Sequence, residues 1–202
     1  MATLGSQLSF DRRSAKRSDA AWMAERLADP GSRYFLLIDL KPCVASSADE
    51  KSGSIRWFNA KQLAELRIDA TEAMYLGDGP DGVSHFAVAI TEHYARHVPG
   101  GPYCLKPYVD VRSLAMQGFL QPEELSIAGQ ARALAHWHDT HRCCSKCGGQ
   151  NRVKDGGWRR QCWSCKLEHF PRTDPVVIML VTDGDKCLLS HEKRFLPNFF
   201  ST

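Results

Sequence analysis

The sequence predicts an α+β fold for its first 120 residues, and three observations support this. Apolar runs of strand length alternate there with short segments of helical periodicity. A longer amphipathic helix is predicted after them, over residues 122–141. Five of the eight cysteines then fall within the 23 residues 143–165, which is typical of a metal-bound module. We expect a mixed domain, a connecting helix and a small metal-stabilised module, in this order.

The first half of the mixed domain is predicted from apolar spacing and capping residues. Residues 19–28 repeat apolar side chains at helical spacing, with Asp19 or Ser18 as the cap and Pro30-Gly31 after the end. The apolar run 34–40 has the length of a strand. Asn59 is placed to cap a short helix over residues 60–66. Further strands are predicted over residues 54–58, 73–76, 85–90 and 108–111.

The segment Gly77–Gly82 (GDGPDG) matches the spacing G-x-G-x-x-G of dinucleotide-binding loops. A true fingerprint opens a helix directly after its strand. Here Pro80 interrupts the segment, and an apolar run of strand length follows it. Because Gly, Asp and Pro are turn residues, we interpret the segment as a hairpin loop.

The long helix and the segment after the cysteines carry the clearest patterns. Pro122 suits a first helical position, and the helix has one apolar face, formed by Leu125, Ala128, Ala131, Leu134 and Ala135. Residues 176–181 (VVIMLV) predict a fully apolar strand. Asp183-Gly184 is a two-residue hairpin signal, so residues 187–190 are expected to pair back onto that strand.

Composition and charge exclude several classes of protein. The chain has 202 residues, 43% hydrophobic and 24% charged, with a formal net charge of +3, which excludes a disordered chain. No apolar run approaches the about 18–20 residues of a membrane helix. The N-terminus lacks the apolar stretch of a secretory signal, so we expect a cytoplasmic protein and leave mitochondrial and peroxisomal locations open. Residues 141–172 hold eight basic and two acidic residues, which indicates either an anionic partner or a solvated basic face.

Two C-x-x-C pairs predict a structural zinc site. Cys144 and Cys147 form the first pair, Cys162 and Cys165 the second, with 14 residues between them. Zinc takes four soft ligands in a tetrahedron, and this spacing is typical of a four-cysteine zinc ribbon. A redox dithiol or free thiols are the alternatives. Cys143 is interpreted as a bystander.

The ribbon cysteines are expected to close the coordination of the metal. A catalytic zinc keeps one position open, so zinc at a four-cysteine site performs no chemistry. The nearby histidines are therefore expected to be surface or packing residues; they are His136, His138, His141 and His169.

Three stretches of the sequence resemble the Nudix-type NADH pyrophosphatases. They are ARALAHWHDTHRCCSKCGG, WRRQCWSC and HFPRTDPVVIMLV, and the similarity covers residues 120–197. It is weaker over residues 1–119, where YLG, FAV and DVRSL occur in a compatible order. The resemblance implies four parts: an N-terminal α+β (Nudix-like) domain, a connecting helix, a zinc ribbon and the start of a Nudix hydrolase domain. Their expected bounds are 1–120, 121–141, 142–172 and 173–202.

The resemblance also implies an activity and its cofactors. The family cleaves the diphosphate of NAD(H) to nicotinamide mononucleotide and AMP, and some members remove NAD caps from RNA. It uses Mg or Mn held by the glutamates of a Nudix box, roughly G-x5-E-x7-R-E-x-x-E-E, and tends to form homodimers. Residues 1–202 contain no such box. We therefore carry over no catalytic residue and expect a fragment of a longer enzyme, with one structural zinc, that is inactive alone.

Two substrate-binding positions follow from the resemblance. Arg112 matches an arginine of the N-terminal domain that contacts substrate, and a guanidinium suits a diphosphate because it binds oxygens in a fork. Phe170 matches an aromatic position at the substrate pocket, without the hydroxyl of a tyrosine. A glutamate of the family falls on Gly157 and is missing. A surface ion pair for Arg112 and simple packing for Phe170 are the alternatives.

Two other functions remain open from the sequence. The ribbon is a candidate nucleic-acid-binding module, because residues 152–160 are basic and Trp158 and Trp163 are able to stack on bases. The chain is also a candidate non-catalytic partner that dimerises with a longer copy of the enzyme.

Overall fold

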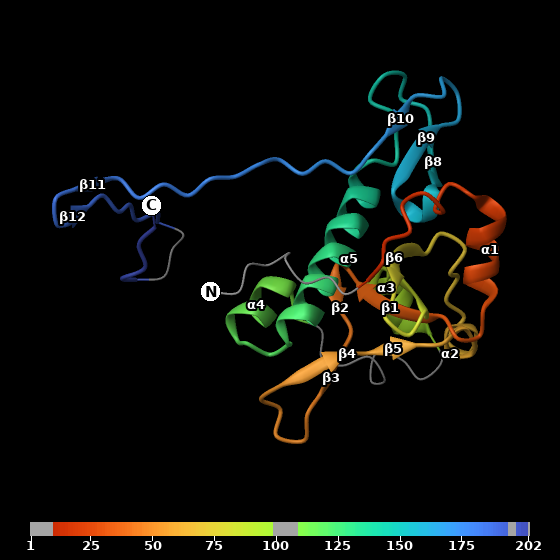
Figure 1. The fold of residues 1–202 in the computed structure, drawn as a ribbon, viewed down its shortest axis with the longest axis horizontal. Coiled ribbons are helices and arrows are strands. Elements are labelled where there is room, and N and C mark those ends of the chain that lie inside the picture. Colours follow the sequence, from red (N-terminus) through yellow and green to blue (C-terminus); the bar gives the residue numbers. More distant parts are fainter. Residues whose placement is uncertain (1–9, 99–108, 194–196, 202) are drawn as a thin grey trace. The chain divides into compact units, whose positions relative to one another are not determined.

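The structure, a computed structural model, describes residues 10–98, 109–193 and 197–201 (Figure 1). The chain forms two compact units, Met1–Pro171 and Arg172–Thr202. No helix of the described residues is long and apolar enough to cross a membrane.

A central sheet organises the first unit (Figure 1). Its strand order is β2 (Lys41–Pro42), β1 (Arg33–Ile38), β7 (Ser84–Ile90), β6 (Met74–Asp78), and β5 (Trp57–Phe58) also pairs with β1. The β1 and β7 strands are parallel, whereas the other pairs are antiparallel. Five of the six residues of β1 are buried, because this continuous apolar run is covered on both faces of the sheet.

Helices cover both faces of this sheet. Alternate residues of β1 point to opposite faces, so that Tyr34 and Leu36 belong to one apolar cluster and Phe35 and Leu37 to another. The first cluster includes residues of α1 (Ala20–Ala28), α2 (Ala60–Glu65) and α3 (Glu92–His97). The second includes residues of α4 (Val111–Met116) and α5 (Pro122–Thr140). The expected α+β fold is therefore a three-layer α/β/α arrangement.

The predicted capping residues begin the helices. The Asp19 carboxylate accepts hydrogen bonds from the backbone N–H groups of Ala21 and Trp22 at the start of α1. Asn59 and Gln62 form a capping box at α2. Pro122 is the first residue of α5. These local predictions are confirmed because capping depends only on neighbouring residues.

Two strand predictions in this unit are wrong. The segment 54–58 divides into β4 (Gly53–Ile55), which pairs with β3 (Val44–Ser46), and β5, which pairs with β1. The predicted strand 108–111 ends inside a helix, since Val111 begins α4 and Asp110 caps it. Residue 108 lies outside the described residues. Asp110 accepts a hydrogen bond from the Ser113 N–H at 3.0 Å. The strand prediction followed the apolar residues of this segment and did not take Asp110 as a helix cap.

The GDGPDG segment forms the end of β6 and the turn that leads into β7, which confirms its interpretation as a hairpin loop. Its Asp78 is buried and accepts hydrogen bonds from Tyr75 (2.7 Å), Ser84 (2.7 Å) and Arg13 (2.9 Å). Burial by itself would raise the pKa of Asp78, but these three donors outweigh it and lower the pKa. Asp78 therefore serves as a buried anchor between the hairpin and the N-terminal segment.

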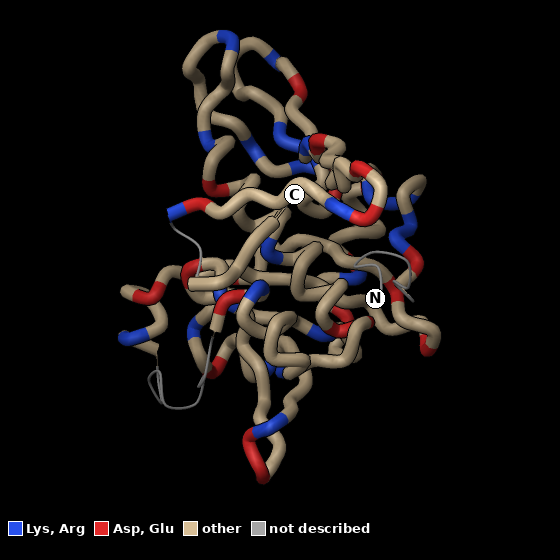
Figure 2. Tube along the Cα trace, turned by 90° about the vertical axis from the view of Figure 1, so that its left-hand side faces the viewer, with Lys and Arg blue, Asp and Glu red and all other residues tan. Residues whose placement is uncertain are grey.

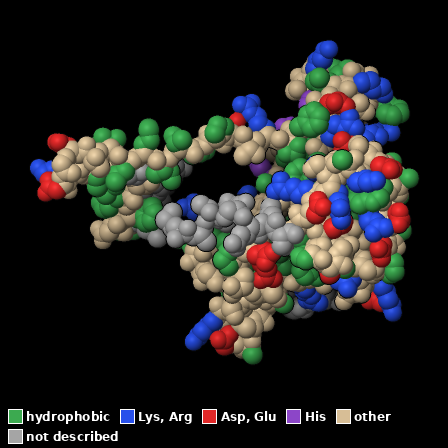
Figure 3. Space-filling model, viewed as in Figure 1, with side chains coloured by type: hydrophobic (Ala, Val, Ile, Leu, Met, Phe, Trp, Pro, Cys, Tyr) green, Lys and Arg blue, Asp and Glu red, His purple; other side chains and the backbone are tan. Residues whose placement is uncertain are grey.

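The second unit lacks the predicted apolar strand. Residues 176–181 are not in a strand and remain 59–86% exposed, and hydrophobic side chains of this unit stand on its surface in Figure 3. A strand of such composition needs a sheet to cover it, and the described residues of this unit form only a short two-stranded sheet. The predicted hairpin is present in a short form, in which β11 (Thr182–Asp183) pairs with β12 (Lys186–Cys187) around Gly184.

Candidate metal centre

A three-stranded antiparallel ribbon follows α5 within the first unit. Its order is β10 (Glu168–His169), β9 (Arg159–Cys162), β8 (Asn151–Lys154). A short helical turn, η2 (Asp155–Gly157), joins β8 to β9. Figure 2 shows Lys and Arg residues along the trace of this ribbon.

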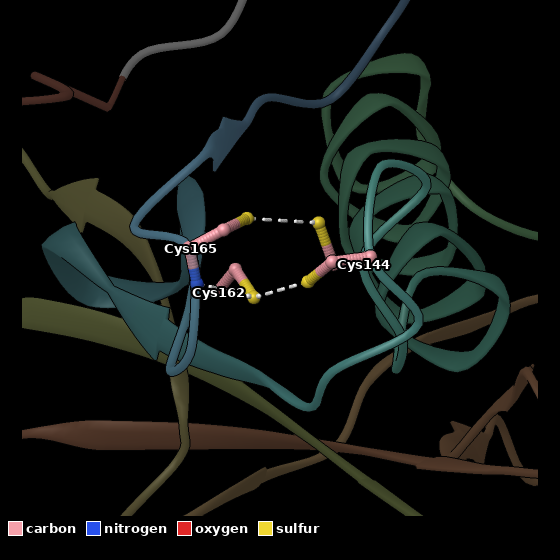
Figure 4. Close-up of side chains that lie close together, drawn as sticks. Cys144, Cys162 and Cys165 are labelled. Atoms are coloured by element: carbon pink, nitrogen blue, oxygen red, sulfur yellow. Dashed lines mark hydrogen bonds between the residues drawn. The ribbon is translucent and has the colours of Figure 1, made fainter.

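The four predicted ligand cysteines converge at the end of the ribbon. Cys144 follows α5, whereas Cys162 and Cys165 lie at the end of β9 and in the turn after it, and their side chains point toward one another in Figure 4. The Sγ atoms of Cys144 and Cys165 are 3.6 Å apart, and those of Cys147 and Cys162 are 3.5 Å apart. All four sulfur atoms lie within 4.8 Å of one another. In the part of the chain that the structure describes, this is the one cluster of at least three potential metal ligands.

These distances fit a tetrahedral zinc ion. With Zn–S bonds of about 2.3 Å, the edges of an ideal sulfur tetrahedron measure about 3.8 Å. The observed separations of 3.5 and 3.6 Å are close to this value, and they far exceed the about 2.05 Å of a disulfide. The set of donors, four sulfurs and no oxygen, is also the set that structural zinc prefers.

Matching turns position the two cysteine pairs. The residue after each pair has positive φ, Gly148 at 72° and Lys166 at 62°. In each turn a backbone N–H donates to the first sulfur, from Lys146 to Cys144 at 3.4 Å and from Cys165 to Cys162 at 3.5 Å. Hydrogen bonding, chiefly from the Cys165 N–H, lowers the pKa of the Cys162 thiol to about 6. At Cys147 the Gly149 N–H acts in the same direction, but the neighbouring sulfurs outweigh it and raise the pKa to about 11. At Cys162 the backbone thus favours the thiolate, which is the form that binds metal.

The neighbouring Cys143 and histidines lie outside this cluster. Cys143 is exposed and forms a backbone bridge with Gln150. The nitrogens of His138 and His141 contact backbone oxygens, of Gly157 at 2.8 Å and of Trp137 at 3.0 Å. As expected, these two histidines make packing contacts.

Sequence reasoning missed how the ribbon attaches to the sheet. The Trp158 Nε1–H donates to the backbone oxygen of Tyr75 at 2.7 Å, on the edge strand β6. Gly157 packs against the same strand, with φ of 91°, and a Cβ there would lie 3.0 Å from two atoms of Met74. The sequence feature that could have indicated this attachment is the Gly-Gly-Trp segment between β8 and β9. A side chain at Gly157 would crowd Met74 of β6 and strain the backbone.

His138 and Arg160 join α5 to the ribbon. The His138 Nε2–H donates to Gly157 O at 2.8 Å, while its Nδ1 accepts from Arg160 Nη1 at 3.1 Å. The same Nη1 donates to His138 O at 2.8 Å. Burial and the nearby Arg160 charge lower the pKa of His138 to about 4. His138 is therefore neutral in the folded protein at neutral pH.

Acidification is expected to weaken the fold through His138. Its pKa is about 4 when folded and about 6.5 when unfolded, so the unfolded chain takes up the proton first. The free energy of unfolding is then unaffected above pH 6.5 and falls by up to about 3 kcal/mol as the pH drops from 6.5 to 4. Urea unfolding across this range measures the slope. His138→Gln keeps a donor and an acceptor and should flatten it, whereas His136→Gln, on an exposed position of the same helix, should not. Equal slopes in all three proteins would contradict the assignment.

The two predicted substrate residues are both in the first unit, on different elements. Arg112 is the second residue of α4 and is exposed. Phe170 follows β10 and is 58% exposed. Neither belongs to the cysteine cluster.

The fold and the cysteine cluster define a class of protein, a mixed α/β domain that carries a zinc ribbon. Residues 31–137 match the NADH pyrophosphatase-like rudimentary NUDIX domain, and residues 139–170 match the NADH pyrophosphatase zinc ribbon domain. The first match covers more than half of the chain. The chain therefore belongs to the NADH pyrophosphatase-like family of NUDIX proteins, as the resemblance predicted.

Curated relatives carry related names. The chain is 30% identical over 235 residues to human NAD-capped RNA hydrolase NUDT12, covering 95% of the chain and 49% of the relative. It is 34% identical over 151 residues to Arabidopsis thaliana Nudix hydrolase 19, chloroplastic, covering 69% of the chain and 34% of the relative. It is 32% identical over 122 residues to NAD-capped RNA hydrolase NudC of Stutzerimonas stutzeri, covering 56% of the chain and 44% of the relative. The chain spans about half the length, or less, of these relatives.

Proposed function

We propose that this chain supplies the NUDIX-like domain and zinc ribbon of a hydrolase that cleaves the diphosphate of NAD(H). From the free dinucleotide the products are nicotinamide mononucleotide, reduced when the substrate is NADH, and AMP. From an NAD cap on RNA they are nicotinamide mononucleotide and RNA with a 5′-monophosphate. One observation carries the proposal: the two matched domains are consecutive in the chain and both are those of NADH pyrophosphatases. The names of the relatives, which include NAD-capped RNA hydrolases, support it.

The four cysteines are proposed to hold one zinc ion, which fixes the ribbon. Cys144 and Cys162 are buried, Cys165 is partly buried and Cys147 is exposed, so the metal would lie at the end of the ribbon. When bound, zinc would cross-link the two C-x-x-C turns. The ribbon in turn holds η2 and Trp158 against β6.

Arg112 and Phe170 are proposed to contact the substrate. The exposed guanidinium of Arg112 is able to bind diphosphate oxygens in a fork, and no ion pair occupies it among the described residues. The exposed ring of Phe170 offers a face for stacking on a base. Without a hydroxyl, it contributes no hydrogen bond.

The described residues do not fit a Mg or Mn site. The cluster that they offer contains four sulfur atoms, whereas Mg and Mn prefer carboxylate and water oxygens. We therefore derive no catalytic step from residues 1–202, and we place the metal-binding glutamates of the proposed enzyme outside them. A homodimer and a cytoplasmic location remain predictions.

An activity assay tests this proposal. The intact endogenous protein is expected to release AMP and reduced nicotinamide mononucleotide from NADH when Mg or Mn is present, and chromatography of the products measures this. Purified residues 1–202 are expected to release no AMP under the same conditions. No AMP from the intact protein would refute the hydrolase proposal. Metal-dependent AMP release by residues 1–202 would refute the placement of the catalytic groups.

Arg112→Ala in the intact protein should raise KM for NADH about tenfold or more, because a charge-assisted hydrogen bond contributes about 1.5–3 kcal/mol. Lys61→Ala, an exposed change on α2, is the matched control.

A further inference from the structure

A large groove lies between α1 and the ribbon, apart from the cysteine cluster. It has a volume of about 1190 Å³ and is lined by α1 on one side and by β8, η2 and β9 on the other. Small-molecule pockets measure about 300–1,000 Å³, so the groove is large for a single small ligand. Its size and open form suit a segment of a polymer.

The groove is strongly basic. Six Lys and Arg residues line it, against the two acidic residues Glu72 and Asp155. Two of the six cations form ion pairs, Arg142 with Asp139 and Arg159 with Asp155 and Glu168. The other four form no ion pair within the described residues; they are Arg17, Arg152, Lys154 and Arg160. Lys and Arg side chains are visible over the ribbon in Figure 3.

Buried polar atoms in the groove lack partners. Arg160 is 7% exposed, and its Nε has no hydrogen-bond partner. The Nε and Nη1 of Arg17 are also buried without a partner. Burial and the positive charge of Arg12 lower the pKa of Arg17, and its guanidinium lies 4.5 Å from the centre of the Trp158 ring. Buried N–H groups without a partner cost free energy, which an anion that accepts hydrogen bonds from them would relieve.

An exposed aromatic ring lies beside this charge. Trp163 is 57% exposed, and the guanidinium of Arg152 lies 3.7 Å from the centre of its ring. The ammonium of Lys166 lies 4.8 Å from the same ring. Cations together with an exposed aromatic face are the combination that binds phosphates and stacks on bases of single strands.

We propose that the groove between α1 and the ribbon binds single-stranded nucleic acid. Arg17, Arg152 and Lys154 contact backbone phosphates, and Trp163 stacks on a base. These contact residues differ from those that the sequence suggested, which were the basic residues 152–160 together with Trp158 and Trp163. Arg159, Arg160 and Trp158 are engaged within the protein, through ion pairs, His138 and Tyr75 respectively, so they are not the groups that contact bases.

The test uses the zinc-loaded 202-residue chain and a fluorescein-labelled, uncapped 20-nucleotide oligouridylate. Anisotropy is recorded at several salt concentrations, and zinc content is checked for each variant. The expected Kd is about 10⁻⁴–10⁻⁶ M at physiological salt. Three phosphate contacts predict a slope of log K against log salt near −2, at about −0.7 per contact.

Two sets of variants separate charge from stacking. Arg152→Gln with Lys154→Gln should make the slope shallower by about 1.4, while Lys51→Gln with Lys61→Gln, an equal change of charge elsewhere, should leave it unchanged. Trp163→Ala should weaken binding about fivefold or more without changing the slope.

Three outcomes would overturn the inference. They are no binding at low salt, equal slopes for the two double variants, and equal affinity for Trp163→Ala and the unchanged protein. Heparin that competes equally well against the unchanged protein and Trp163→Ala would indicate a general polyanion site, and would overturn it too. Because the oligonucleotide carries no NAD, these outcomes are independent of the hydrolase proposal.

Discussion

Cys165→Ser is expected to reduce bound zinc from one ion per chain to nearly none and to unfold the ribbon. Cys165 supplies one of four sulfurs that lie within 4.8 Å of one another. Apparent zinc-binding free energies in four-ligand fingers are about 10–16 kcal/mol, so the loss of one ligand should cost roughly 2–4 kcal/mol. Metal analysis after gel filtration and thermal unfolding with and without added zinc measure the effect.

Cys143→Ser is the matched control for this change. Cys143 is adjacent to the first cysteine pair but is exposed and lies outside the cluster. Its replacement should leave both zinc content and thermal stability unchanged. If Cys143→Ser lost zinc and Cys165→Ser retained it, the assignment of ligands would be wrong.

Trp158→Ala is expected to detach the ribbon from the sheet and to lower stability by about 2–4 kcal/mol. Removing a buried tryptophan costs about 3–5 kcal/mol, and Trp158 is half-buried against the second apolar cluster. The change also removes the hydrogen bond from its indole to Tyr75 O. Urea unfolding at saturating zinc measures the change while keeping the cysteine site intact.

Trp163→Ala is the control that shows whether the loss of stability in Trp158→Ala comes from detaching the ribbon from the sheet or from losing any tryptophan of the ribbon. Trp163 belongs to the same ribbon but is 57% exposed, and exposed substitutions usually change stability by less than about 0.5 kcal/mol. Trp158→Ala should also increase the proteolytic sensitivity of the segment between α5 and β8, whereas Trp163→Ala should not. Equal losses of stability in the two variants would contradict the proposed attachment.

Local signals explain which elements were predictable. The Asp19 and Asn59 caps, the apolar face of α5 and the hairpin after β6 depend on residues near one another in sequence. The cysteine cluster was predictable for the same reason, because a C-x-x-C turn brings its two sulfurs together locally and only the pairing of the two turns is long-range. The four cysteines do converge in the structure.

The features that could not be predicted from the sequence depend on contacts between residues far apart in the chain. The apolar segment 176–181 has the composition of a strand, but composition does not provide a neighbouring strand, and the segment is exposed. The contact of Trp158 with Tyr75 joins residues 83 positions apart, and no spacing rule anticipates it. The basic segment 152–160 likewise contains both unpaired cations and residues engaged in internal contacts, and only the fold distinguishes them.

Zinc K-edge X-ray absorption of the purified chain is the decisive measurement for the metal-stabilised ribbon. Four sulfur neighbours at about 2.3 Å, at one zinc per chain, are expected for a site formed by Cys144, Cys147, Cys162 and Cys165. Loss of the zinc signal in Cys165→Ser, with the four-sulfur spectrum retained in Cys143→Ser, would complete the assignment. A spectrum with nitrogen or oxygen neighbours in the unchanged protein, or the absence of zinc, would contradict it.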